Sequence, residues 1–244
     1  MKKKILFIGA THGNEYLGVD MIEQFKKTKY RKKFSGLIAN PGALAESKRF
    51  VEADLNRVFP GKKNGNYEER RAQEILRVAS KYDWVVDLHG SASATGIFII
   101  ITKFTLANLL LALRFDIDKI VVWPGVPETS GSLSTYMSAG IEIESGFRDD
   151  SKIKKALKKK LEGFFERLDT PLDLEKEMKK KQIFWYAGKL EKKNTKRPRG
   201  LKNWQKIKDY YPLFVDGQYS DLWCYKFKKV DLFNFELCSR EMSL

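Results

Sequence analysis

The sequence predicts an α/β fold: a mostly parallel mixed β-sheet flanked by helices, followed by a small β-rich C-terminal domain. Short apolar runs without helical periodicity alternate with amphipathic helical segments through the first two thirds of the chain. This rhythm changes around residues 169–171, and the apolar residues after position 183 come in short aromatic runs. A chain of 244 residues can form a main domain with an appendage. We expect an α/β catalytic domain over residues 1–169 and a β-rich domain over residues 170–244.

The elements can be assigned in chain order. Strands of the first domain are predicted at residues 4–10, 34–39, 84–88, 97–101, 119–123 and 140–144. Apolar residues recur at helical spacing in four other segments, at residues 16–25, 68–80, 106–115 and 152–167. Strands that alternate with helices usually form a largely parallel sheet that is covered on both faces. In the second domain, strands are expected at residues 183–186, 210–215, 222–227 and 232–237.

Composition and charge narrow the class of protein. The apolar run at the N-terminus breaks at Gly9, so it indicates a first strand rather than a signal peptide, and no apolar run is long enough to span a bilayer. Two cysteines, Cys224 and Cys238, could pair if they are close in space, but they make no disulfide framework. We therefore expect a soluble cytoplasmic protein with no membrane partner.

The net charge of +15 comes mainly from lysine, which is dense at residues 189–208. One interpretation is a solvated surface, as in a heat-adapted organism. The other is binding to nucleic acid or an acidic partner, because such a charge attracts polyanions. No compact nucleic-acid-binding motif accompanies the charge, so we favour the solvated surface and do not expect nucleic-acid binding.

The only two histidines both follow predicted strands. His12 lies just past the first strand, and His89 comes directly after the strand at 84–88. In open α/β sheets, ligands bind at the carboxyl ends of the strands. Glu15 follows His12 by three residues, which lets both side chains converge on one ion. Two imidazoles and a carboxylate are a common ligand set of hydrolytic zinc sites. Each residue alone could be a turn cap, a helix start or a polar strand end, but the three together favour a metal.

A hydrolase also needs a base, and the strand at 140–144 offers two carboxylates. Glu142 and Glu144 are two residues apart, so both face the same side of the sheet. Glu144 lies closer to the carboxyl end of the strand and is the better candidate. The alternative is an edge strand with one solvated face.

A long loop between residues 40 and 61 carries further candidates. Arg49, Asn56 and Arg57 suit the binding of a substrate carboxylate, and Arg49 could instead polarise the carbonyl that is attacked. Loops of this length in compact domains are usually functional. The alternative is an ordinary surface loop rich in acidic and basic residues.

Taken together, five ordered motifs resemble the signature of the succinylglutamate desuccinylase and aspartoacylase family, whose core is similar to that of zinc carboxypeptidases. The resemblance covers roughly residues 4–150. The motifs are GATHGNE at 9–15, NP at 40–41, an arginine at 49 with DLNR at 54–57, DLH at 87–89, and ESG at 144–146.

This resemblance implies a carboxypeptidase-like α/β core whose active site is partly covered by a β-rich C-terminal domain. It implies roles for eight residues. One Zn²⁺ per chain is bound by His12, Glu15 and His89, Glu144 is the catalytic base, and Arg49 polarises the amide carbonyl. Asn56 and Arg57 hold a substrate carboxylate, and Tyr225 would correspond to the family's substrate-contacting tyrosine.

The sequence also departs from the aspartoacylase pattern, which has another arginine about ten residues before the catalytic glutamate. Residues 130–136 (SGSLSTY) contain no positive charge. We therefore expect that a second substrate carboxylate is not recognised as it is in aspartoacylase.

The resulting prediction is a zinc-dependent amidohydrolase that acts on an N-acyl amino acid, with Asp87, Asn14 and Asp54 available to orient the histidines or the loop. Two alternatives stay open. One is a zinc carboxypeptidase that acts on peptides, and the other is a non-catalytic basic protein that binds nucleic acid.

Overall fold

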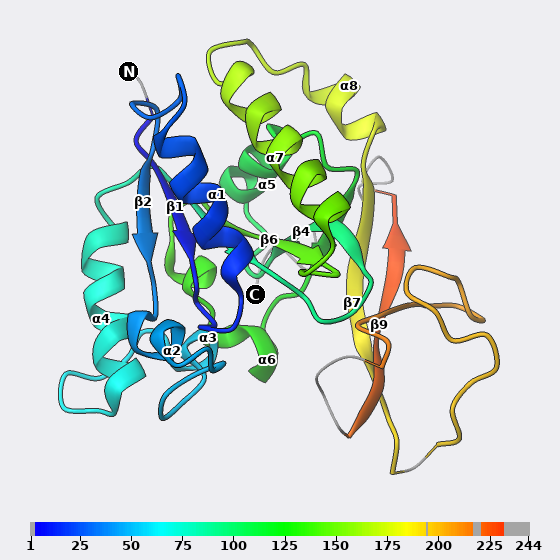
Figure 1. The fold of residues 1–244 in the computed structure, drawn as a ribbon. Helices are drawn as coiled ribbons and strands as arrows, with labels where there is room; N and C mark the ends of the chain where they lie inside the picture. Colours follow the sequence, from blue (N-terminus) through cyan, green and yellow to red (C-terminus); the bar gives the residue numbers. More distant parts are fainter. Residues whose placement is uncertain (1–2, 194, 217–220, 232–244) are drawn as a thin grey trace.

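The computed structural model describes residues 3–193, 195–216 and 221–231, and Figure 1 shows its fold. Within these residues, nine strands form one mixed sheet with the order β2-β1-β3-β6-β4-β5-β7-β9-β8. The strands are β1 (Ile5–Gly9), β2 (Ser35–Ile38), β3 (Trp84–His89), β4 (Gly96–Ile101), β5 (Lys119–Val122), β6 (Gly140–Gly146), β7 (Gln182–Glu191), β8 (Tyr211–Leu213) and β9 (Leu222–Val230). The predicted α/β class is confirmed.

Helices cover both faces of this sheet. The larger ones are α1 (Tyr16–Lys26), α4 (Tyr67–Ala79), α5 (Leu106–Leu113) and α7 (Ser151–Glu166). The shorter ones are α2 (Pro41–Ala45), α3 (Leu55–Val58), α6 (Pro127–Ser130), η1 (Leu133–Tyr136) and α8 (Leu174–Lys179). In Figure 1, α1 and α7 lie side by side in front of the sheet, and Lys154 of α7 donates a hydrogen bond to Asp20 of α1 at 2.5 Å. No helix in the described part of the chain is long and apolar enough to cross a membrane.

The predicted helices and strands of the first 169 residues are all present, and their ends differ from the prediction by two residues or fewer. Most pairs in the sheet are parallel, but β4 runs antiparallel to β6, and β9 runs antiparallel to both β7 and β8. The predicted strands at 183–186 and 222–227 are longer than expected, because each extends beyond its aromatic run. The strand expected at 232–237 lies outside the described residues, as does Cys238.

The strands after residue 170 continue the main sheet. β7 pairs in parallel with β5, from Lys119 opposite Gln182 to Val122 opposite Trp185. β9 then pairs with β7, and β8 with β9. In Figure 1, the long strands β7 and β9 lie on the side of the sheet opposite β2. The division of the chain at residues 169 and 170 stays a prediction.

On one face of the sheet, polar side chains in the middle divide the apolar core into two parts. The other face is packed continuously by α1, α5 and α7. On the divided face, one apolar cluster forms where α3 and α4 cover β1, and a second forms where residues of β8 and β9 cover β4 and β5. Between the two clusters, the central strands β3 and β6 carry acidic and imidazole side chains on this face: Asp87, His89, Glu142 and Glu144. Burial of charged side chains in the middle of a core is costly, so their presence there indicates a functional site.

Candidate active site

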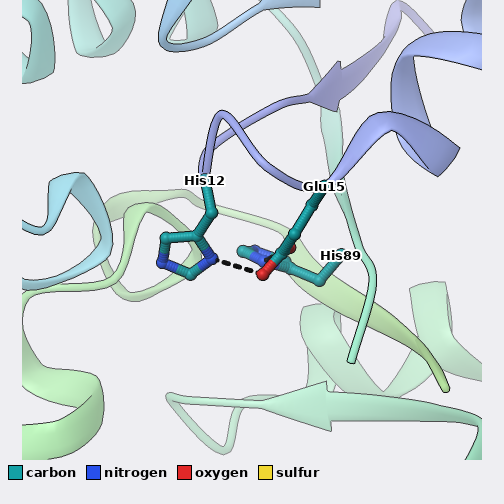
Figure 2. Close-up of side chains that lie close together, drawn as sticks. All are labelled: His12, Glu15 and His89. Atoms are coloured by element: carbon teal, nitrogen blue, oxygen red, sulfur yellow. Dashed lines mark hydrogen bonds and ion pairs between the residues drawn. The ribbon is translucent and has the colours of Figure 1, made fainter. Parts of the chain in front are cut away.

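His12, Glu15 and His89 meet at one edge of the sheet. β1 and β3 are parallel neighbours, with Gly9 opposite Leu88, so both strands end at the same edge. His12 lies in the turn after β1, Glu15 is the N-cap residue of α1, and His89 is the last residue of β3. Figure 2 shows the three side chains converging. The structure thus brings together residues that are 74 positions apart in the sequence.

The geometry of these three side chains fits one metal ion. Nδ1 of His12 lies 2.8 Å from Oε1 of Glu15, and Nδ1 of His89 lies 3.1 Å from Oε2 of the same carboxylate. One donor atom from each residue lies within 4.8 Å of the others, and all three residues are buried. Two imidazole nitrogens and a carboxylate at this spacing are the donor set of a hydrolytic zinc site.

A second carboxylate lies behind each histidine. Nε2 of His12 is 3.0 Å from Oδ1 of Asp54, and Nε2 of His89 is 3.1 Å from Oδ2 of Asp87. Asp87 is itself held by the hydroxyl of Thr11, which lies 2.8 Å and 2.9 Å from its two oxygens. Asp54 is hydrogen-bonded to Nε2 of His12, whereas Asp87 lies at ion-pair distance from Nε2 of His89. A carboxylate in this position favours a proton on Nε2, which leaves the lone pair of Nδ1 to face a bound metal.

Arg49 connects the loop after β2 to this centre. Its Nε and Nη2 atoms donate to Oδ2 of Asp54 at 3.0 Å and 2.8 Å, and its Nη1 lies 3.8 Å from Oε1 of Glu15. Burial by itself would raise the pKa of Asp54, but the hydrogen bond with His12 and the charge of Arg49 lower it well below its usual range. Asp54 therefore stays ionised and links the arginine to the first histidine.

Glu68 anchors the same loop. It is fully buried, and its carboxylate accepts hydrogen bonds from the backbone amides of residues 51, 52 and 53 and from the side chain of Asn40. These bonds hold the segment between Arg49 and Asp54. Sequence reasoning missed this role, because Glu68 stands in the first turn of a helix, where an acidic residue is ordinary.

Glu144 lies next to His89 across the β3–β6 pair. Its Oε2 atom is buried and has no hydrogen-bond partner among the described residues. Burial raises the pKa of Glu144 to about 7, and the charges of Glu15 and Glu142 act in the same direction. A carboxyl group with a pKa near neutrality is suited to accept and return a proton.

These side chains open onto one cavity of about 40 Å³. Seven of the eight predicted site residues line it, namely His12, Glu15, Arg49, Asn56, Arg57, His89 and Glu144. Oδ1 of Asn56 is buried without a hydrogen-bond partner in the described part of the chain, which leaves it available to a ligand. Its neighbour Arg57 donates from Nη1 to the backbone oxygen of Asn56 at 2.8 Å.

The eighth predicted residue, Tyr225, is not among the residues that line the cavity. It is buried on β9, and its ring packs at 4.6 Å, centroid to centroid, against that of Trp123, which does line the cavity. Phe214, near the end of β8, completes this wall. In this arrangement Tyr225 supports the wall from behind.

Sequence reasoning missed several residues of the cavity wall. Only Trp123 carries a signal that could have identified it, since it follows β5 at the carboxyl edge of the sheet. Asn14, which the sequence suggested as a residue that orients the histidines or the loop, is not one of the residues of this wall. Its Oδ1 is buried and has no hydrogen-bond partner among the residues described. The other missed residues of the wall are Ser91, Ile100, Glu128, Thr129, Ser132 and Phe214.

Comparison with known proteins gives relatives in sequence and in structure. Over 129 residues the chain is 34% identical to a probable aspartoacylase of Trichodesmium erythraeum. This alignment covers 46% of this chain and 44% of that protein. Over 117 residues it is 36% identical to the aspartoacylase of Rattus norvegicus, covering 41% of this chain and 38% of the relative. The aligned segments thus span less than half the length of these two relatives.

The fold is also that of solved structures. Murine aminoacylase 3 superposes with a TM-score of 0.73 at 16% identity, covering 94% of this chain and 96% of that one. The succinylglutamate desuccinylase of Chromobacterium violaceum gives a TM-score of 0.69 at 17% identity, covering 94% and 85% of the two chains. The model of the succinylglutamate desuccinylase/aspartoacylase catalytic domain matches residues 1–146, which include all three residues that converge at the candidate metal centre. The chain therefore belongs to the succinylglutamate desuccinylase/aspartoacylase family.

Proposed function

We propose that this protein hydrolyses the amide bond of an N-acyl amino acid with the help of one zinc ion. The observation that carries the proposal is the convergence of His12, Glu15 and His89 at the mouth of a cavity that also contains Glu144. Family membership supports the class of reaction, since members include proteins named aspartoacylase and N-acyl-aromatic-L-amino acid amidohydrolase.

The metal would be held by Nδ1 of both histidines and by the carboxylate of Glu15. When bound, the ion supplies Lewis-acid polarisation of the amide carbonyl and lowers the pKa of water. The protein fixes this donor set from behind, since Asp54 and Asp87 each face the far nitrogen of one imidazole.

The remaining steps belong to the side chains around the metal centre. Glu144 takes a proton from the attacking water and then passes it to the nitrogen of the leaving amine. Arg49 stabilises the negative charge that develops on the carbonyl oxygen, because its guanidinium lies 3.8 Å from the carboxylate of Glu15. Asn56 and Arg57 bind the carboxylate of the amino acid and so position the scissile bond.

The shape of the cavity favours a small substrate over a peptide. Trp123 and Phe214 form a wall across the site, and they line the same cavity as His12, Glu15 and His89. A carboxypeptidase requires an open cleft for the peptide chain. We therefore assign an N-acyl amino acid, a compact amide with one carboxylate, in preference to a peptide.

The test combines metal analysis with a substrate screen. We expect about one zinc ion per purified chain, and turnover of N-acetyl or N-succinyl amino acids that is lost on chelation. Glu144→Ala should keep the zinc and lose hydrolysis by two or more orders of magnitude. Glu175→Ala, which removes an exposed glutamate of α8, is the matched control and should leave the zinc content and the rate of hydrolysis unchanged.

Three results would contradict the assignment. The first is undiminished turnover in the Glu144→Ala variant. The second is purified protein that takes up no divalent metal. The third is faster cleavage of peptides than of acyl amino acids.

A further inference from the structure

Glu142 is a buried carboxylate that faces the cavity and has no positive partner among the described residues. It is 4% exposed and lines the same cavity as Glu144. Within the described ranges it makes no ion pair, and its one hydrogen bond comes from the hydroxyl of Ser134, at 2.8 Å to Oε1. Burial of a carboxylate is costly unless a cation or several donors compensate it. One hydroxyl does not provide that compensation.

The hydroxyl groups around Glu142 are arranged to donate toward it. Ser134 has one proton and gives it to Glu142, so in the 2.8 Å contact between Ser134 and Thr102 the donor must be Thr102. This chain of donors ends at the carboxylate and polarises it as an acceptor. The segment that supplies Ser134, residues 130–136, contains no lysine or arginine. This wall of the cavity therefore presents negative charge.

We infer that Glu142 binds a second amino group of the substrate, so that the amino acid released by this protein is a diamino acid. The inference rests on the proposed function and extends it to the substrate's side chain. An ammonium group would supply the positive partner that the buried carboxylate lacks, and a charge-assisted hydrogen bond of this kind is strong.

The spacing of the two carboxylates fits a short diamino acid. Glu142 and Glu144 lie on the same face of β6, two residues and therefore about 7 Å apart along the strand. In the proposed reaction Glu144 passes its proton to the nitrogen of the scissile amide, so Glu142 is placed to meet a second nitrogen a few bonds away, as in ornithine.

The arrangement of the walls favours the amino acid, rather than the acyl group, as the part of the substrate that carries the second charge. The amide of Phe59, two residues after Arg57, donates to the backbone oxygen of Gly131 at 3.2 Å. The segment with Arg57 therefore packs against the segment that supplies Ser134. A carboxylate held by Arg57 and an ammonium held by Glu142 would lie on adjoining walls, which fits the amino acid rather than the acyl group.

The experiment compares three acetylated substrates with the zinc-loaded protein. Nα-acetylornithine carries the extra amine, Nα-acetylnorvaline has the same carbon chain without it, and N-acetylaspartate carries the opposite charge. We expect kcat/KM for Nα-acetylornithine to exceed that for Nα-acetylnorvaline by more than about tenfold, the effect of one hydrogen bond to a charged group. In Glu142→Gln this ratio should fall toward one.

Glu128→Gln is the matched control, because it removes another carboxylate from the same cavity. Glu128 already faces Lys189 at 4.0 Å, so the substrate ratio should survive its loss. Calorimetric binding of free ornithine and norvaline to the zinc-loaded protein gives a second measurement that needs no turnover. Ornithine should bind more tightly than norvaline, and Glu142→Gln should abolish the difference.

The outcomes separate this inference from the proposed function. Equal turnover of the ornithine and norvaline substrates, or preference for N-acetylaspartate, would overturn the inference and leave the amidohydrolase assignment standing. If no acyl amino acid is hydrolysed, the proposed function fails, and the calorimetric comparison then decides whether Glu142 binds an amine. Equal binding of ornithine and norvaline would refute it.

Discussion

Each histidine of the candidate metal centre stands between two carboxylates. Glu15 faces Nδ1 of both rings, while Asp54 and Asp87 face the far nitrogens. The outer carboxylates favour a proton on the far nitrogen of each ring, so the inner nitrogens are available to bind metal. The affinity of the site is therefore set in part by residues that do not touch the metal.

This arrangement predicts the effect of Asp87→Asn. An amide in place of the carboxylate no longer requires the proton to sit on Nε2 of His89, so the affinity for zinc should fall about ten- to hundredfold. Competition with a chromophoric chelator measures this change. Asp116→Asn, which removes an exposed aspartate that pairs with Lys160, is the control and should bind zinc like the parent protein. Equal affinity of the two variants would show that Asp87 does not orient the ligand.

At the scale of elements, the site depends on close contact between α1 and the ends of β1 and β3. Gly18 of α1 lies so close to β3 that a Cβ atom built on it would be 2.7 Å from the backbone oxygen of Leu88. Leu88 directly precedes His89, and Glu15 is the N-cap residue of α1. The separation of Glu15 and His89, two of the candidate metal ligands, thus depends on a glycine that has no functional side chain.

Two glycine-to-alanine variants test this contact. Alanine is favoured over glycine in a helix interior by about 0.5–1 kcal/mol. In α7, Gly163 has open space around its Cβ position, so Gly163→Ala should raise the free energy of unfolding by about that amount. In Gly18→Ala the clash with a backbone atom should reverse the sign and also weaken zinc binding. Urea denaturation and the chelator assay measure both effects. A stabilised Gly18→Ala variant would mean that α1 moves freely against β3.

The places of both histidines and of the candidate base were predictable at this scale, because each lies at or near the end of an apolar strand. His12 follows β1, His89 ends β3, and Glu144 lies two residues before the end of β6, and parallel neighbours end at one edge. The two short helices within the loop at 40–61 were not predicted. α2 and α3 have five and four residues and depend on caps from Asn40 and Asp54, and such short elements show no periodicity.

At the scale of the whole molecule, the sequence did not allow us to predict which distant strands pair with each other. Apolar periodicity indicated strands after residue 170, but it carries no information about their partners. In the structure β7 extends the main sheet, and Phe184 of β7 shares an apolar cluster with Phe98 of β4 and Phe214. The Trp123 and Phe214 wall of the cavity depends on this continuity, which is why sequence reasoning missed most of that wall.

Continuity of the sheet predicts that the chain unfolds as one unit. Cys224 on β9 is a probe of the C-terminal strands, since burial raises the pKa of its thiol to about 11 and protects it from thiol reagents. In a Cys238→Ser background, Cys224 should become reactive at the same urea concentration at which far-UV circular dichroism reports loss of helix, because β7 and β9 cannot leave the sheet without exposing the face of β4 and β5. Labelling of Cys224 well below that midpoint would instead show that residues 170–244 open independently, as two separate domains would. A coincident transition would mean that the strands behind the wall formed by Trp123 and Phe214 are as stable as the rest of the sheet, which carries the candidate metal centre.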